Sequence, residues 1–570
     1  MIPIDIGRLR ELDSDIEVLR SQATSWARLA ERDRIEILGR VKDGVMEVAE
    51  QWVDAAAAAK QIPSHSPLVG EEWMSGPYAV MAACDLLIET LSMMDGRAYL
   101  DALKKRTLAN GQLAVTVAPN SVWDRVLLSG VHAEVWMQPG VTAENLGAHT
   151  AGAYAVSPGD RSGKVALVLG AGNIAAITPL DVFHKLFTEL QVVVLKMNPV
   201  NEYLTPFIDH ALKPLIDIGA LRVVTGDGQI GAYLSEHHEI DEIHITGSGH
   251  THDLIVWGSG REAQRNRADG TPRLTKRVTS ELGAVCPTIV VPGAWSKADI
   301  RFQAEQIATQ KMHNSGFNCV ACQVLVLPQG WDLADCLVEE IERVVSDMPQ
   351  RGLYYPGADE RLATFADRAE NLRTIERVGG ESCLVAEHLP GSHTHEVFAP
   401  ALSVVRLAGT GESFLQSAIE FANESLHGTL GANIVIDPAT LKEIGNSRFD
   451  NLISGLRYGA IAVNTWTALS FLMNQATWGA FPGHTLDDVQ SGIGVVHNSF
   501  MFDRPERTIV RAPFRPFPRN LRHRSFTLLP RPPWFVTNTQ AAKLGRLLVE
   551  FQHRPSWAKV PRIFGHALKG

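Results

Sequence analysis

The segment that decides the fold is residues 164–196, which read KVALVLGAGNIAAITPLDVFHKLFTELQVVVLK. Residues 164–169 form an apolar run typical of a buried strand, and residues 192–196 form a second one. Residues 175–190, between them, can form a helix. Because a strand, a helix and a second strand in succession make a right-handed crossover between parallel neighbours, this segment predicts a parallel sheet covered by helices.

The same alternation continues toward the C-terminus. Further strands are expected at residues 221–226 and 242–247, again separated by helical segments. A second set of apolar, strand-like runs follows at residues 288–291, 324–327, 403–405 and 432–436. We therefore predict an α/β fold built on parallel strands.

The regions outside these units have patterns of their own. Residues 7–60 are expected to be helical, because apolar side chains recur there near helical spacing. Residues 112–142 alternate in places and indicate a strand or hairpin. After about residue 494 the chain becomes rich in proline and arginine, with one late helix expected near residues 539–551.

The composition indicates an ordinary globular protein. The 570 residues suffice for two or three domains, and 45% hydrophobic with 20% charged residues is typical of that class. The six cysteines are scattered without a framework spacing, which fits a reducing compartment. The N-terminus lacks a basic region followed by an apolar core, and the longest nearly uncharged stretch, residues 165–180, is too short to span a bilayer. We therefore expect a cytoplasmic protein.

Charge is distributed unevenly along the chain. Residues 501–570 hold 14 Lys or Arg and 3 Asp or Glu, although the whole chain has a formal net charge of -10. We expect this basic tail to pack on the acidic body or on a neighbouring subunit, and contact with an anionic membrane surface is the alternative. Nucleic acid is not expected as a partner, because the arginines are spread among prolines and apolar residues rather than clustered on one helix face.

A glycine-containing turn, residues 170–176, lies between the first strand and the first helix. Its pattern G-x-G-x-x-A is similar to the dinucleotide fingerprint. That fingerprint expects an acid at the end of the next strand, where this chain has Lys196. A basic residue there weakens the NAD interpretation and suits a phosphorylated ribose.

A thiol and a carboxylate stand in unusual settings. Cys319 lies in the stretch HNSGFNCVAC, residues 313–322, a small glycine-containing turn before an apolar run, so the thiol can be presented to a pocket. Glu281 lies in TSELG, residues 279–283, an otherwise apolar stretch. Together they suggest a covalent mechanism with a nucleophile and a base that activates water.

Each of these residues also has a structural interpretation. The alternatives for Cys319 are an inert buried thiol or a redox pair with Cys322, and those for Glu281 and Glu396 are structural acids. Zinc would need a second cysteine pair, which the sequence does not contain at zinc spacing. No metal is expected, because the histidines are interpreted as surface or strand-end residues; they are His237, His238, His244, His250 and His252.

Taken in order, these segments resemble the aldehyde dehydrogenase superfamily from about residue 20 to about residue 490. The resemblance rests on the turn ITGSG at 245–249, TSELG at 279–283, GFNCVA at 316–321, HEVFAP at 395–400 and YGAIAVN at 458–464. It implies a Rossmann-type cofactor domain over 1–282, with an arm segment near 126–145, and an α/β catalytic domain over 283–475. Residues 476–570 would hold the return of a β oligomerisation arm and a basic C-terminal extension.

The resemblance also implies roles for single residues. Cys319 would be the nucleophile, Glu281 the general base, and Asn173 would help to hold the oxyanion. A site for NAD or NADP would be formed by Lys196, Thr246, Gly247, Ser248, Glu396 and Phe398. The implied reaction is NAD(P)-dependent oxidation of a small-molecule aldehyde to a carboxylic acid through a cysteine thiohemiacetal and a thioester, in a homodimer or homotetramer.

The sequence departs from the family pattern at several positions. Pro199 stands where many NAD-preferring members have a ribose-binding Glu, which permits NADP, and Phe317 replaces a customary Gln. One alternative is therefore an acyl-CoA reductase or CoA-acylating aldehyde dehydrogenase that uses the same thiol. Another alternative is a catalytically silent binding or scaffold protein on the same fold.

Overall fold

The computed structural model describes residues 5–377, 380–388, 392–523 and 525–570. The first sheet has the order β17-β8-β7-β4-β5-β6, in which five strands are parallel and β17 is antiparallel at the edge. Every residue of β4 and β5 is buried, which explains their unbroken apolar runs. The predicted parallel sheet is confirmed; its strands are β4 (Val165–Leu169), β5 (Val192–Lys196), β6 (Leu221–Val224), β7 (Glu242–Gly247), β8 (Arg277–Leu282) and β17 (Gly492–Ile493).

Helices connect these strands, as the crossover pattern requires. The helix expected at 175–190 forms as α7 (Ile177–Phe183) followed by a π-helical turn at His184–Thr188. After β6, the side chain of Asp227 caps α10 (Gly228–Glu236), and after β7, Ser248 caps α11 (Gly249–Trp257). The loops that follow the strands therefore meet at one edge of the sheet, where parallel α/β sheets bind ligands.

The second sheet has eleven strands in the order β1-β2-β3-β19-β15-β14-β9-β10-β13-β12-β11. The seven strands from β19 to β12 are parallel, and antiparallel strands close both edges. The central strands are β9 (Cys286–Val290), β10 (Cys322–Pro328), β13 (Ala401–Leu407), β14 (Gly431–Val435), β15 (Ala460–Val463) and β19 (Pro505–Arg511). The edges are β1 (Lys105–Thr107), β2 (Leu113–Ala118) and β3 (His132–Met137) on one side, and β12 (Cys383–His388) and β11 (Glu370–Ile375) on the other.

The segments predicted to form an oligomerisation arm lie in this sheet. The segment near 126–145 contains β3, and the region after 480 contains β19. β19 pairs with β3 on one side and runs parallel to β15 on the other. The strands expected to reach toward a partner therefore extend this chain's own sheet.

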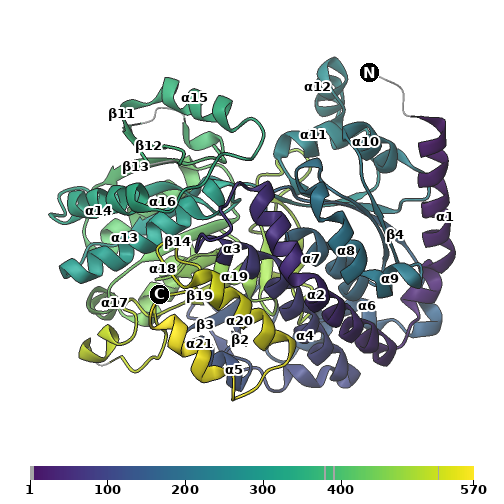
Figure 1. Ribbon diagram of the computed structural model, residues 1–570, viewed down its shortest axis with the longest axis horizontal. Helices are drawn as coiled ribbons and strands as arrows, with labels where there is room; N and C mark the ends of the chain where they lie inside the picture. Colours follow the sequence, from purple (N-terminus) through teal and green to yellow (C-terminus); the bar gives the residue numbers. More distant parts are fainter. Residues whose placement is uncertain (1–4, 378–379, 389–391, 524) are drawn as a thin grey trace.

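Helices from the two ends of the chain pack together. Residues 7–60 form α1 (Ile6–Ala27) and α2 (Glu31–Ala59), as predicted, and are followed by α3 (Val69–Trp73) and α4 (Ala79–Ser92). The predicted late helix is α20 (Ala541–His553), and α21 (Val560–Ala567) follows it. α20 packs on α3 and also contacts α2 and α4, and α21 packs on α20; both are drawn in yellow in Figure 1.

The basic tail is attached to the body of its own chain. Asp299, at the start of α13 (Lys297–Met312), accepts hydrogen bonds from Arg515 at 2.8 Å and from Arg519. The next acid on that helix, Glu305, lies 3.0 Å from Arg531. These ion pairs agree with the expectation that the tail packs on an acidic body.

Candidate active site

Cys319 is presented by a loop in an unusual backbone conformation. α13 ends at Met312, and a short turn, His313–Gly316, leads to the thiol just before β10. Asn314, Ser315 and Gly316 have φ of 54°, 53° and 76°, three left-handed residues in succession. Only glycine adopts this conformation without cost, so the surrounding structure has to hold Asn314 and Ser315 in place.

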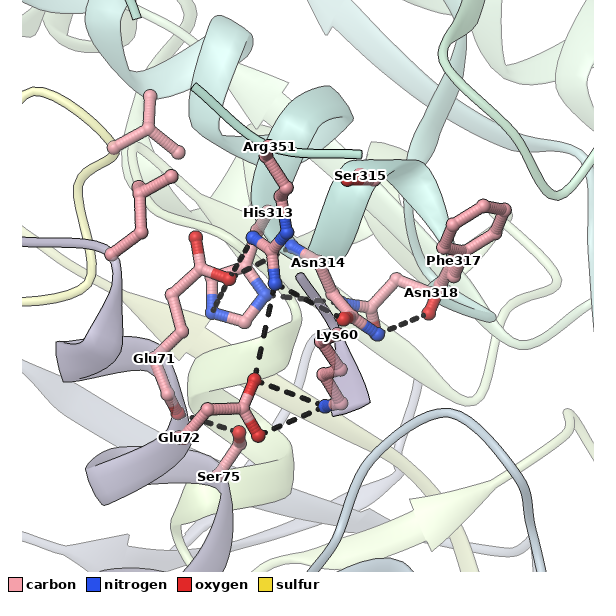
Figure 2. A network of polar contacts seen from close by, with 12 residues as sticks. Lys60, Glu71, Glu72, Ser75, His313, Asn314, Ser315, Phe317, Asn318 and Arg351 are labelled. Carbon is pink, nitrogen blue, oxygen red and sulfur yellow. Dashed lines mark hydrogen bonds and ion pairs between the residues drawn. The ribbon is translucent and has the colours of Figure 1, made fainter. Parts of the chain in front are cut away.

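A buried network of charges holds this loop (Figure 2). Glu71 Oε2 accepts a hydrogen bond from the backbone N–H of Asn314 at 3.0 Å and from Arg351 Nη1 at 2.5 Å. Glu72 accepts from Lys60 Nζ at 2.9 and 3.0 Å and lies 3.9 Å from Arg351. The four charged side chains are at most 4% exposed, and two cations balance two anions, which offsets the cost of burying them.

The side chain of Asn314 joins the loop to Asn173. Asn314 Nδ2 donates to the carbonyl of Phe317 at 2.9 Å and to the carbonyl of Asn173 at 3.1 Å. Asn173 Nδ2 in turn donates to the carbonyl of Phe317 at 3.1 Å, and the hydroxyl of Tyr354 donates to both asparagines. The predicted oxyanion residue and the predicted nucleophile therefore belong to one hydrogen-bonded unit.

Glu281 lies against Cys319. The thiol of Cys319 and the side chain of Trp478 both lie beside the Glu281 carboxyl group, and Glu281 Oε1 is buried without a hydrogen-bond partner among the described residues. Burial, with Asp181 nearby, raises the pKa of Glu281 to about 8. Burial, with Glu281 and Glu396 nearby, raises the pKa of the Cys319 thiol well above its usual value. The thiol is therefore protonated at neutral pH, and the Glu281 carboxyl group beside it can take that proton once it is itself ionised.

One cavity of about 1000 Å³ brings the predicted residues together. It lies between the two sheets' loops, with Cys319 in its lining. All nine residues singled out from the sequence line it: Asn173, Lys196, Thr246, Gly247, Ser248, Glu281, Cys319, Glu396 and Phe398.

The end of the cavity near the thiol contains a buried carboxyl oxygen without a partner among the described residues. Glu396 Oε1 is fully covered, and it has no hydrogen-bond partner among the described residues. Burial raises the pKa of Glu396 to about 8, although the residue as a whole is only half-buried. Gly283 faces it, and a Cβ there would lie 1.8 Å from Glu396 Oε2. This buried oxygen can accept a hydrogen bond from a bound ligand that carries hydroxyl groups.

Gln323 fixes the segment that carries Glu396. Its side-chain amide donates to the carbonyl of His395 at 2.8 Å, and its Oε1 accepts from the N–H of Val397 at 2.8 Å. Arg361 donates to the carbonyl of Val397 at 2.9 Å and also lines the cavity. The sequence motif identified Glu396 but not these two supports, which come from other segments of the chain.

The far end of the cavity is formed by β5, β7 and the loops that follow them. Lys196 ends β5, and burial lowers its pKa. Ser248 Oγ accepts the N–H of Thr251 at 3.2 Å as the cap of α11, so the first turn of that helix faces the cavity. The Thr246 hydroxyl donates to Asp181 at 2.7 Å, which fixes the side chain at this end of the cavity.

Several residues near the thiol carry no signal in the sequence. Asp181 is one of two acids in the helix predicted at 175–190, and Trp478 lies outside every motif. Glu71 and Arg351 are 280 residues apart. The one available signal is that Glu71 and Glu72 are adjacent acids in the otherwise apolar stretch LVGEEWM, residues 68–74, which indicates paired buried charge.

A second, smaller chamber lies beside Cys319. It has a volume of about 40 Å³ and is lined mostly by apolar side chains, including Trp466, Phe471, Trp478 and Trp534. Cys319 lines both this chamber and the large cavity, whereas Glu281 lines the large cavity. A thiol between two spaces can receive one ligand from each.

Two features are absent from the part of the chain that the structure describes. In the ranges that the structure describes, no group of three or more His, Cys, Asp or Glu is arranged to hold a metal ion. Over the same ranges, no helix has the length and apolar character needed to cross a membrane.

Comparisons with known proteins find sequence similarity to one family over part of the chain. Residues 191–352 match the Aldehyde dehydrogenase family. D-glyceraldehyde dehydrogenase (NADP(+)) of Picrophilus torridus is 24% identical over 332 residues, which cover 51% of this chain and 60% of that protein. The chain spans 54–60% of the length of the curated relatives it matches.

Solved structures share the fold over most of the chain. The aldehyde dehydrogenase KauB from Pseudomonas aeruginosa has a TM-score of 0.58 at 17% identity, covering 88% of this chain and 89% of that one. PnpE in complex with nicotinamide adenine dinucleotide has a TM-score of 0.59 at 17% identity, with the same coverage of 88% and 89%. These likenesses show that the chain has this fold.

Proposed function

Because this chain belongs to the aldehyde dehydrogenase superfamily, we propose that it oxidises an aldehyde to a carboxylic acid with NAD or NADP. The observation that carries the proposal is the shared cavity of about 1000 Å³, where Cys319, Glu281 and Asn173 meet the residues predicted to bind the cofactor. A relative is named as NADP(+)-dependent and a structural neighbour holds NAD, which supports a nicotinamide nucleotide as the occupant.

The first step uses the contact between Cys319 and Glu281. The thiol proton moves to the Glu281 carboxylate, and Sγ forms a bond to the aldehyde carbon, which gives a thiohemiacetal. The carbonyl oxygen becomes an oxyanion, held by the Cys319 N–H and by the second N–H of the Asn173 amide. Asn173 uses its first N–H on Phe317, which fixes the direction of the second.

A bound nicotinamide would supply the acceptor for the hydride of the aldehyde carbon, which stays attached to Sγ as a thioester. Glu281 releases the thiol proton to solvent and then takes a proton from water, whose oxygen attacks the thioester carbon. The acid leaves as the Cys319 thiolate is released, and that thiolate recovers a proton from Glu281. One carboxyl group in contact with the thiol serves both proton transfers.

The cofactor residues fit a nucleotide by chemistry as well as by position. The unpaired Glu396 Oε1 can accept a ribose hydroxyl, and the first turn of α11 beyond Ser248 offers N–H groups to phosphate. Lys196 and Pro199 line the far end. Pro199 is not a carboxylate, so nothing at that position repels a 2′-phosphate, and both NAD and NADP are accommodated.

The contact between Glu281 and Cys319 favours hydrolysis over transfer to coenzyme A, because a water-activating base is in place. Product analysis with and without coenzyme A separates the two: free acid in both supports the proposal, and an acyl-CoA product contradicts it. Assembly as a homodimer or homotetramer and a cytoplasmic location stay predictions.

The central test is the nucleophile. Cys319→Ala is expected to lose aldehyde oxidation, followed as nucleotide reduction with NAD and NADP in parallel, while still binding the nucleotide in a thermal-shift assay. Retained turnover in that variant contradicts the mechanism. Failure of the unmodified protein to bind either nucleotide favours a silent binding protein instead.

A further inference from the structure

A larger apolar cavity lies beyond the small chamber beside the thiol. We call the 40 Å³ space the thiol chamber and the larger one, of about 280 Å³, the outer chamber. The two spaces have four lining residues in common: Met74, Leu469, Leu472 and Trp534. Only this layer of apolar side chains separates the outer chamber from the chamber that contains Cys319.

The walls of the outer chamber are largely apolar. Its lining residues from α4, α5 (Val122–Leu127) and α20 include Leu86, Trp123, Leu127, Leu544, Leu548 and Phe551. The charged groups at its edge already have partners inside the protein. Asp85 accepts from Lys42 at 2.5 Å and from Gln552 at 2.8 Å, and Glu89 accepts from Asn120 at 3.0 Å. The chamber therefore suits an apolar ligand rather than a charged one.

The C-terminal extension forms one side of this chamber and is firmly fixed. Residues 529–534, α20 and α21 all contribute to the lining. The N–H of Val536 donates to Thr309 Oγ1 at 3.1 Å, which ties the segment to α13, the helix that leads into the catalytic loop. α20 also packs closely on α3, where a Cβ on Gly545 would lie 2.5 Å from Trp73 Cβ (Figure 1).

We propose that the aldehyde substrates carry an extended linear apolar chain. The carbonyl end would reach Cys319 in the thiol chamber, and the chain would pass between Trp534 and Leu472 into the outer chamber. The thiol chamber is too small for such a chain alone, and each methylene buried in the outer chamber adds favourable transfer free energy. This substrate class rests on the proposed function, whereas the apolar route to Cys319 does not.

The route is tested without turnover, by alkylating the thiols with N-ethylmaleimide and N-octylmaleimide. In each case Sγ forms a bond to one alkene carbon, and the thiol proton ends on the neighbouring carbon. Cys336 is exposed and serves as an internal control thiol. Peptide mass spectrometry should show an octyl-to-ethyl rate ratio at Cys319 at least tenfold above that at Cys336. Equal ratios at the two cysteines overturn the proposal.

A pair of variants assigns the effect to the outer chamber. Leu86→Trp, at a half-buried lining position on α4, is expected to remove most of the octyl preference at Cys319. The matched control Val122→Trp places the same side chain at a position that is 46% exposed, and should keep the preference. If Leu86→Trp keeps it too, while circular dichroism shows an unchanged fold, the octyl chain lies elsewhere and the proposal fails. The unmodified protein supplies a result even if that variant does not fold.

Aldehyde oxidation is then measured from propanal to decanal. We expect kcat/KM to rise about fourfold for each added methylene until the chamber is filled. If no aldehyde is oxidised but octylmaleimide still prefers Cys319, the proposed function fails and the apolar route stands. If propanal and decanal are oxidised equally well, the function stands and the substrate class is wrong.

Discussion

The carboxyl group of Glu281 lies beside the thiol of Cys319, and burial raises the pKa of both groups so that both are protonated at neutral pH. Glu281 lies on β8 of the first sheet, and Cys319 lies in the loop before β10 of the second sheet. Their contact makes the protonation of a single carboxyl group decisive for the reaction.

The rate should therefore increase with pH. Burial raises the pKa of Glu281 to about 8, and only the deprotonated carboxylate can accept a proton, so kcat/KM is expected to rise about tenfold per pH unit below pH 8 and level off above it. Glu281→Gln should lower kcat by about 10²–10⁴-fold and remove this dependence. The measurement is a pH–rate profile between pH 6 and 10. A flat profile in the unmodified protein argues against Glu281 as the base.

Glu396 should make the protein less stable at higher pH. Its pKa is raised to about 8 in the folded state, from an ordinary value of 4.5. Between these values the folded state keeps a proton that the unfolded state releases, so the free energy of unfolding falls as pH rises from 4.5 to 8. Glu396→Gln removes this contribution, and the loss of Tm between pH 5 and pH 8 should be smaller in the variant.

The control for that experiment is Glu420→Gln, at an exposed position on α16 (Gly411–Ser425), which should leave the pH dependence of Tm unaltered. Equal slopes for all three proteins would mean that the Glu396 carboxyl group is ionised in the fold. Nucleotide affinity measured on the same variants at pH 9, where the Glu396 carboxylate is ionised, gives a second result, because the neutral amide introduced by Glu396→Gln has no charged oxygen with which to accept a ribose hydroxyl.

Breaking the buried network should cost far more than breaking a surface ion pair. Arg351→Met leaves Glu71 buried without its cation, and the expected loss in the free energy of unfolding is about 3–5 kcal/mol. Arg546→Met removes an exposed pair with Glu50 and should cost about 0–1 kcal/mol. Urea unfolding of both variants makes the comparison. Similar losses in the two would show that the network contributes little.

The close contact between α3 and α20 should be sensitive to a single methyl group. A Cβ on Gly545 would lie 2.5 Å from Trp73 Cβ, so Gly545→Ala is expected to lower the free energy of unfolding by about 1–3 kcal/mol. On α21, a Cβ at Gly565 would meet no described atom within 4 Å, and Gly565→Ala should be neutral or stabilise by up to about 1 kcal/mol. Thermal unfolding of the two variants measures the difference. A Gly545→Ala protein as stable as Gly565→Ala would mean that the helices can separate freely.

Local patterns predicted the sheets well, because a buried parallel strand needs an apolar run that is visible in the sequence. β4, β5, β9 and β14 each lie where such a run was found. The pairing of β19 with β3 could not be predicted in this way, since register between segments so far apart in the chain leaves no local trace.

The same limit applies to the site. Cys319, Glu281 and Glu396 stand out because a polar or reactive group interrupts an apolar or glycine-rich stretch. Arg351 and Trp534 act through contacts with distant segments, and an arginine or a tryptophan in a loop is unremarkable by itself. The proposed reactive residues could therefore be predicted from the sequence. The residues that hold them in place and line the thiol chamber could not.

The position of β19 has a consequence for how the chain is made. The strand lies between β3, from the first quarter of the chain, and β15. Until residues 505–511 leave the ribosome, β3 and β15 each present an unpaired edge, and the sheet that supports Cys319 stays in two parts. Folding of this sheet must wait until residues 505–511 have been synthesised, and during that wait the two unpaired edges are open to pairing with other chains.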